Sequence, residues 1–171
     1  MEAHLTGEPT ASPHSSTGHD CATCEECGAA IAGGTEGCHE LMADLTVRSP
    51  DARRLVVRRT VVDAYALQHP VSRCATDKDV ALHLLSLCCA LEYNNNLDIY
   101  SGMNTWLRRA RDLPSLNIPA FRGAMTIVDA DAARSIEEYI ERVRKWALTV
   151  WEAWHEHHDT VRGWIEEIRA R

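Results

Sequence analysis

Apolar residues recur at steps of three and four along roughly the last forty residues of the chain. At 100° per residue this spacing keeps one face apolar, which predicts an amphipathic helix from about Ala132 to Arg169. Its apolar face contains Ile136, Ile140, Val143, Ala147, Val150, Trp154, Val161, Trp164 and Ile168. The segment holds no proline, and Gly163 is its only glycine. We therefore expect an unbroken helix to about residue 162, with any bend at Gly163.

Earlier segments show the same helical spacing of apolar positions. They predict helices over about residues 36–46, 50–69, 76–92 and 103–111. Pro50 suits the first turn of the second helix, and Pro70 ends that helix. Asn94 to Asn96 break the third helix. Pro114 and Pro119 indicate an extended connection. These features favour an all-α fold, a four- to five-helix bundle that ends in a long helix.

The first twenty residues are rich in Ser, Thr, Pro, Gly and His and show no periodicity. This composition predicts a disordered leader over residues 1–20, followed by a single helical domain over residues 21–171. The chain has 171 residues, which is about one domain.

The predicted final helix is long for a domain of this size. Thirty-eight residues at about 1.5 Å each extend roughly 57 Å if straight, whereas a compact domain of this length is about 40 Å across. The apolar face continues through Trp164 and Ile168, so an overhanging end would expose large side chains. We expect a homodimer contact through the C-terminal helix to cover that end.

The apolar face of the final helix has one gap, and two histidines fill it. His157 and His158 replace a core layer, which is costly unless the rings are hydrogen bonded or bind a metal. His83 borders the apolar stripe of the 76–92 helix. The alternative is a pair of hydrogen-bonded histidines near a wet end of the bundle. Cys88 and Cys89 lie in apolar sequence and are expected to pack in the core.

Composition and charge limit the class of function. The net charge is -7, so no overall positive field favours nucleic acid or an anionic membrane. No apolar run approaches the roughly 20 residues of a membrane span, and no secretory signal is visible. The seven cysteines are then those of a cytoplasmic, reduced protein. Phosphate-loop, nucleophile-elbow and dinucleotide-binding motifs are absent from the sequence.

The strongest chemical signal is the segment Cys24-Glu-Glu-Cys27-Gly28, followed by Cys38. Two thiols at this spacing, with a glycine after the second, are typical of a zinc knuckle. Tetrahedral zinc needs a fourth ligand, and His69 at the end of its helix is preferred over Cys21. An iron–sulfur cluster, a redox pair and cysteines without metal are the alternatives.

Three segments resemble an uncharacterised bacterial family of small proteins with a metal knuckle. They are the CxxCG start with its later cysteine, the segment VDAYALQHP over residues 62–70, and the tail WxxWxxHHxxVRxW over residues 151–164. The resemblance covers roughly residues 24–165 and implies no substrate. It implies motif roles for six residues: Cys24, Cys27, Cys38, His69, His157 and His158. The chain is also loosely similar to DinB-like four-helix bundles, which hold a divalent metal with three histidines from different helices.

Two functional hypotheses follow. In the first, the protein is a metal-dependent enzyme acting on a small molecule, with a structural Cys3His zinc site. Its second site would hold a second divalent metal or act by acid–base chemistry through His83, His157 and His158. Tyr65 and Asp63 would orient groups or transfer protons there. In the second, the protein is a non-catalytic, zinc-stabilised helical module that binds another protein.

Overall fold

The computed structural model describes residues 21–47, 52–110 and 112–170, with the side chains of residues 52–56 left aside. The secondary structure begins with a short hairpin and is helical thereafter. Its elements are β1 (Cys21–Thr23), β2 (Ala30–Ala32), α1 (Gly34–Val47), α2 (Ala52–Gln68), α3 (Pro70–Arg73), α4 (Asp77–Glu92), α5 (Leu97–Arg109), α6 (Ile127–Asp131), α7 (Ile136–Ala153), the 3-10 turn η1 (His155–His157) and α8 (His158–Arg169). The all-α fold is therefore confirmed, while the predicted leader and Pro50 lie outside the described residues.

Local signals set most helix ends. Thr76 caps α4, because its hydroxyl accepts a hydrogen bond from Asp79 N while the Asp79 carboxylate accepts one from Thr76 N. Asn96 starts α5, since its side-chain oxygen accepts hydrogen bonds from two backbone amides of the first turn. The asparagine run thus both ends one helix and begins the next. For this reason α5 begins six residues before the expected start at residue 103.

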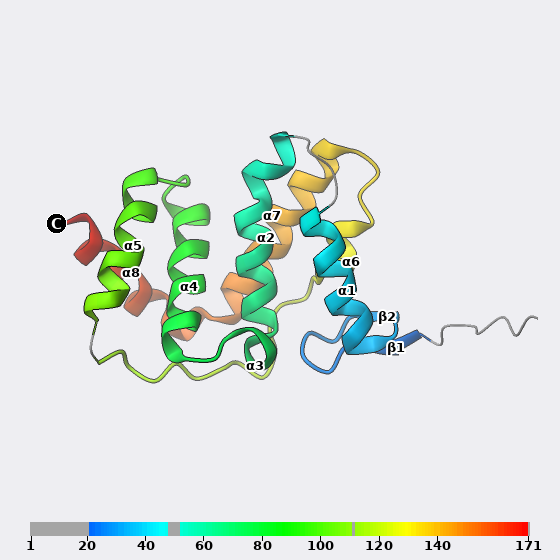
Figure 1. The fold of residues 1–171 in the computed structure, drawn as a ribbon, viewed down its shortest axis with the longest axis horizontal. Coiled ribbons are helices and arrows are strands. Elements are labelled where there is room, and N and C mark those ends of the chain that lie inside the picture. Colours follow the sequence, from blue (N-terminus) through cyan, green and yellow to red (C-terminus); the bar gives the residue numbers. More distant parts are fainter. Residues whose placement is uncertain (1–20, 48–51, 111, 171) are drawn as a thin grey trace, which may run out of the picture.

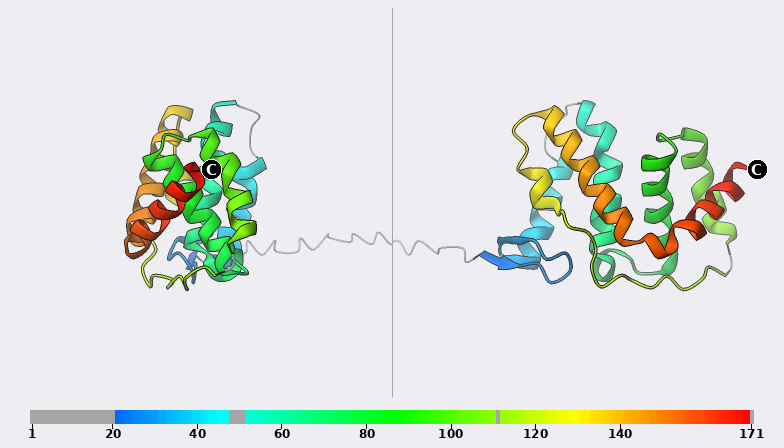
Figure 2. Two further views of the ribbon diagram at one scale, coloured as in Figure 1. Left: turned by 90° about the vertical axis from the view of Figure 1, so that its left-hand side faces the viewer. Right: turned by 180° about the vertical axis from the view of Figure 1, so that it is seen from behind.

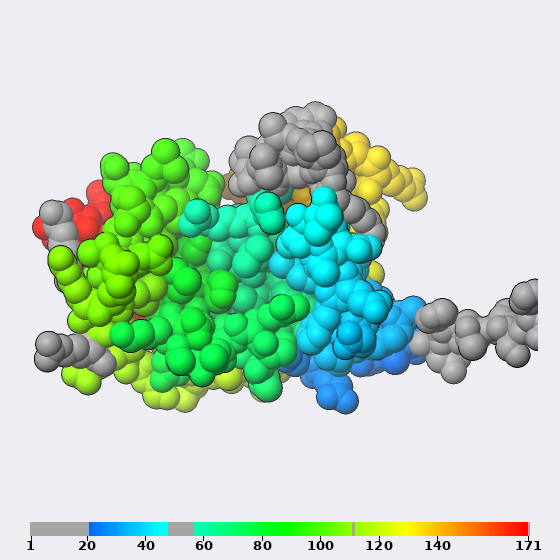
Figure 3. Space-filling model, in the orientation of Figure 1, coloured from blue at the N-terminus to red at the C-terminus, as the bar shows by residue number. Residues whose placement is uncertain are grey.

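The helices form two layers. Helices α5, α4, α2 and α1 lie side by side in one layer, and α7 and α8 cross behind them (Figures 1 and 2). Helix α2 packs against α4 and α7, whereas α8 packs against α4 and α5. Side chains of neighbouring helices meet across the front of the first layer (Figure 3). The tryptophans of α7 and α8 and three leucines of α4 (Leu84, Leu85 and Leu87) are buried in the hydrophobic core.

The expected continuous C-terminal helix is wrong. Helix α7 ends at Ala153, the turn η1 follows, and α8 begins at His158. Figure 2 shows the resulting V shape on the rear face. The break lets α7 cover α2 while α8 covers α5, so both apolar faces are buried within one chain. Gly163, where we expected any bend, lies inside α8.

The break also removes the reason for expecting a dimer at the helix end. Trp164 is 7% exposed, and its ring centroid lies 5.4 Å from that of Trp106 on α5. The apolar end of the helix therefore has a cover within the same chain, and the homodimer remains a prediction without this support. In the described part of the chain, no helix has the length and apolar character of a membrane span.

The N-terminal hairpin lies directly against α1. Strand β1 pairs with β2 in antiparallel register, with Cys21 opposite Ala32. Gly37 in the first turn of α1 faces this hairpin so closely that a Cβ there would lie 1.8 Å from Ala32 O. Only a residue without a side chain permits this approach. It places the next residue, Cys38, beside the hairpin loop.

Candidate metal centre

The loop between β1 and β2 presents two cysteines to the same point. Cys24 N donates to Ala29 O at 2.8 Å, and Gly28 N donates to Cys24 O at 2.9 Å, which closes the loop tightly. Gly28 has a φ of 78°, a conformation that side chains rarely adopt. This accounts for the glycine that follows the second cysteine in the sequence.

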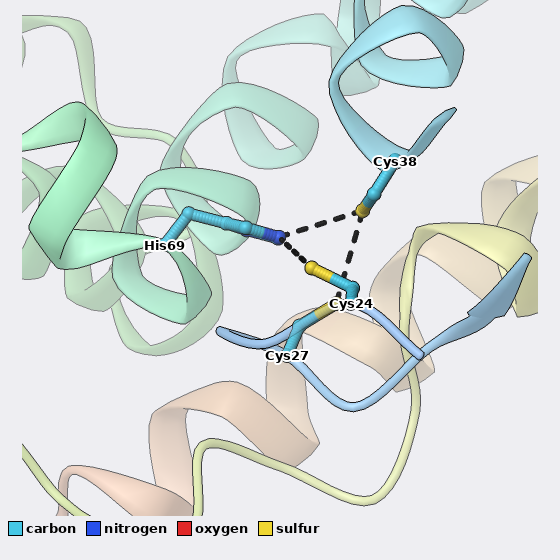
Figure 4. A group of neighbouring side chains, drawn as sticks. All are labelled: Cys24, Cys27, Cys38 and His69. Carbon is cyan, nitrogen blue, oxygen red and sulfur yellow. Dashed lines mark hydrogen bonds between the residues drawn. The ribbon is translucent and has the colours of Figure 1, made fainter. Parts of the chain in front are cut away.

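Two helices supply the remaining side chains of the cluster. Cys38 projects from α1, and His69 follows the last residue of α2 (Figure 4). Cys24, Cys38 and His69 are almost completely buried, whereas Cys27 is half-buried. Segments more than forty residues apart thus meet at one site. The preferred fourth residue, His69, belongs to the cluster, while Cys21 lies exposed on β1 outside it.

The distances within the cluster fit a tetrahedral ion. Cys24 Sγ and Cys38 Sγ lie 3.5 Å and 3.4 Å from His69 Nε2, and Cys27 Sγ lies 3.8 Å from Cys38 Sγ. All four ligand atoms lie within 4.8 Å of one another. Metal bonds of about 2.3 Å to sulfur and about 2.0–2.1 Å to nitrogen give tetrahedral edges of about 3.8 Å between sulfurs and about 3.5–3.6 Å from sulfur to nitrogen. The three cysteines are free, and the 3.8 Å between Cys27 Sγ and Cys38 Sγ is far longer than the roughly 2.05 Å of a disulfide bond. The four residues form a possible metal site.

The surroundings of His69 orient its ring for metal binding. His69 Nδ1 lies 2.8 Å from Tyr65 O, so Nδ1 carries the proton and donates it to this carbonyl. The unprotonated Nε2 then faces the sulfurs. The Tyr65 ring stacks on the imidazole with centroids 3.9 Å apart. Tyr65 therefore positions the imidazole through its carbonyl and ring, and its predicted role in proton transfer remains a prediction.

The Cys27 thiol is held in its protonated form when no metal is bound. The hydrogen bond with Cys38, followed by burial, raises the pKa of Cys27 to about 12. A coordinated cation reverses this preference, because a thiol that binds a metal is deprotonated. Metal binding at this cluster would therefore release protons and depend on pH.

Hydrogen bonds outside the cluster also join the hairpin loop to the end of α2. The Arg122 guanidinium donates to the carbonyl oxygens of Glu26 and Gln68. The Glu26 carboxylate accepts a hydrogen bond from Val71 N at 3.0 Å. Arg122 and Glu26 carry no local signal in the sequence, because their partners lie 96 and 45 residues away along the chain.

Two of the predicted catalytic residues do meet. The side chain of Asp63 is buried between α2 and α4, where it accepts a hydrogen bond from His83 Nδ1 at 2.9 Å and another from Ser86 Oγ. Burial raises the pKa of Asp63. Helix α4 thus covers the side of α2 that carries Asp63. The pair lies outside the Cys3His cluster.

The two predicted catalytic histidines of the final helix do not occupy the core layer that we expected. His157 and His158 are half-exposed, because the helix breaks just before them. His157 Nε2 lies 3.0 Å from Asn117 O, and His158 Nε2 lies 2.9 Å from Trp151 O. Within the described ranges, the Cys3His cluster is the sole group of three or more potential metal ligands. His83, His157 and His158 are therefore not brought together as the expected second site.

Contacts around the helix break account for much of the C-terminal motif. Glu92 at the end of α4 accepts hydrogen bonds from Trp151 Nε1 at 2.9 Å and from Arg162 Nε at 2.8 Å. Trp154 Nε1 donates to Leu67 O. The His158 ring stacks on Trp151 with centroids 3.9 Å apart. These residues hold α7 and α8 at their angle, and sequence reasoning missed Glu92 because only the fold brings it here.

Comparison with family models identifies the chain. The model of a family of unknown function (DUF5946) matches residues 22–155, so the chain belongs to this family. The match includes Cys24, Cys27, Cys38 and His69 and ends before His157. Neither the curated proteins nor the solved structures give a match to this chain.

Proposed function

We propose that the Cys3His cluster of this family member holds a structural zinc ion and that the protein is a non-catalytic helical module that binds another protein. One observation supports the structural role. Four protein side chains fill every corner of the tetrahedron, whereas catalytic zinc sites keep a corner for water or substrate. Three thiolates with one imidazole are a typical structural ligand set.

The preference for zinc comes from the donors and their spacing. Thiolate and imidazole together suit zinc, and the sulfur–nitrogen distances of 3.4 Å and 3.5 Å match its tetrahedral edges. An iron–sulfur cluster is usually bound by thiolates alone, and its several iron and sulfide atoms separate the ligand sulfurs more widely. When bound, zinc would supply charge and rigid geometry, and it would join the hairpin, α1 and the end of α2.

The structure supports the module better than the enzyme. The enzyme hypothesis depended on His157 and His158 as buried histidines with no structural role. Both instead have hydrogen-bond partners at the helix break. The pair of buried Asp63 and half-buried His83 still favours acid–base chemistry, because the hydrogen bond from Nδ1 to Asp63 leaves Nε2 of His83 for proton transfer. However, Ser86 and Asp63 also link α2 to α4, which is a sufficient structural role.

Metal analysis of the purified protein tests the zinc site. We expect about one zinc per chain, with the bands of a tetrahedral thiolate site after exchange for Co²⁺. Cys38→Ser should lose the metal and several kcal/mol of stability, because the energy of metal binding is energy of folding. Cys21→Ser is the matched control and should keep both. A wild-type protein that binds neither zinc nor Co²⁺ would disprove the proposal, even if the Cys38 variant fails to fold.

A further inference from the structure

A groove runs along α7 near its C-terminal end. One wall is the last two turns of α7, and the other is the connection over residues 117–124. Two adjoining cavities of about 590 Å³ and 210 Å³ make up this groove and share Pro119, Ala153 and His155. We call it the α7 groove. None of its lining residues belongs to the Cys3His cluster.

The α7 groove gathers exposed apolar side chains. Six large apolar side chains are exposed in the described part of the chain, and three of them line this groove. These are Ile118 at 46%, Leu148 at 42% and Phe121, the only phenylalanine in the sequence, at 68%. Scattered apolar residues are ordinary on a surface, but a cluster in a groove indicates a binding site.

Carboxylates without partners border the apolar surface. Glu152 lines one cavity and Glu156 the other, and neither carboxylate has an ion pair or hydrogen bond to any described residue. By contrast, Glu138 pairs with Arg142 and Glu141 pairs with Lys145 earlier on the same helix. A partner with positive charge beside apolar side chains therefore complements this groove.

We propose that the α7 groove binds a short segment of another protein, with apolar residues against Phe121 and Leu148 and flanking Lys or Arg beside Glu152 and Glu156. This proposal depends on the module function proposed above and names its binding surface. A second copy of this chain is disfavoured as the occupant, because two molecules with a charge of -7 would bring acidic rims together. The mode resembles the binding of an amphipathic segment in a groove.

A pair of synthetic peptides tests the charge and the apolar contact together. One fluorescein-labelled amphipathic peptide alternates Leu and Lys in a helical pattern, and the other has Glu at every Lys position. Fluorescence anisotropy with the zinc-loaded protein should show micromolar binding of the Lys peptide that weakens with salt, and at least tenfold weaker binding of the Glu peptide. Phe121→Ser should weaken binding of the Lys peptide at least tenfold, and the Glu152→Gln, Glu156→Gln double variant several-fold.

Controls separate this groove from the zinc site. Val71→Ser removes an apolar side chain that is 77% exposed and lies outside the groove, so binding should not change. The groove variants should keep the zinc content and melting temperature of the wild type. A failure of the zinc proposal can therefore be distinguished from a failure of the groove proposal. Equal binding of both peptides, no binding of the Lys peptide, or unchanged binding by Phe121→Ser would overturn the proposal. A concentration-dependent dimer that Phe121→Ser abolishes would also overturn it, in favour of a second copy.

Discussion

Replacing His158 by Leu distinguishes a structural from a catalytic role for the C-terminal histidines. Periodicity alone predicts that Leu restores the apolar face and keeps or raises stability. The structure predicts the opposite, because His158 Nε2 donates to Trp151 O at 2.9 Å and the ring stacks on Trp151. The hydrogen bond contributes about 0.5–1.5 kcal/mol and the stacking a similar amount. Since Leu recovers part of the packing, we expect a loss of about 1–2 kcal/mol.

Urea and thermal unfolding, followed by circular dichroism, measure this difference. For a chain of this size, about 1–2 kcal/mol lowers the melting temperature by roughly 2–8 °C. His155→Leu is the matched control, because His155 is exposed and, among the described residues, its ring hydrogen bonds only to the carbonyl of Glu152. Its effect should stay within about 0.5 kcal/mol. A His158→Leu variant as stable as the wild type would refute the structural role and restore the prediction from periodicity.

Two further changes test packing and charge. Gly37→Ala places a Cβ 1.8 Å from Ala32 O, so it should cost about 1–3 kcal/mol or more and weaken zinc binding. Gly163→Ala should be neutral or stabilising, because beyond the neighbouring backbone of its own helix its Cβ would meet nothing within 4 Å. Calorimetry and zinc titration check both variants, and a harmless Gly37→Ala would contradict the close approach. The hydrogen bonds from Arg162 lower the pKa of Glu92 below its usual value of about 4.5. The stabilisation from the ionised Glu92 carboxylate is therefore complete above about pH 4.5 and is lost as the pH falls through the lowered pKa. Glu92→Gln should therefore be less stable at pH 7 and lose less stability than the wild type on acidification; parallel pH profiles in urea unfolding would argue against this.

The sequence predicted the metal cluster well because its information is local and chemical. A short loop with two cysteines and a following glycine is typical of a metal knuckle, and His69 follows a helix on its buried side. The prediction needed only one contact between distant segments. The approximate positions of α1, α2 and α4 were accessible for the same reason, since apolar spacing and a cap such as that at Thr76 act over a few residues.

The break between α7 and α8 was not predictable from periodicity. Residues 154–158 keep the helical spacing of the apolar face, so the apolar pattern continues across the break without a signal. What stabilises the break lies elsewhere in the chain, in Glu92, Leu67 O and Asn117 O. The contact of Asp63 with His83 and Ser86 was hidden for the same reason, because a single helix does not reveal which of its sides a neighbouring helix covers.

The candidate zinc site lies at a segment that buries few apolar side chains. The tryptophan side chains, which bury the largest areas, all lie in α5, α7 and α8 or directly after α7. The hairpin and α1 bury only cysteines, Ala29, Gly34, Met42 and Leu45. So few apolar side chains provide little hydrophobic stabilisation for this segment. A bound ion would add stabilisation at this point, with two ligands in the hairpin loop, one in α1 and one beyond α2. Because the remaining helices have their own aromatic core, metal binding should matter most for the attachment of residues 21–47.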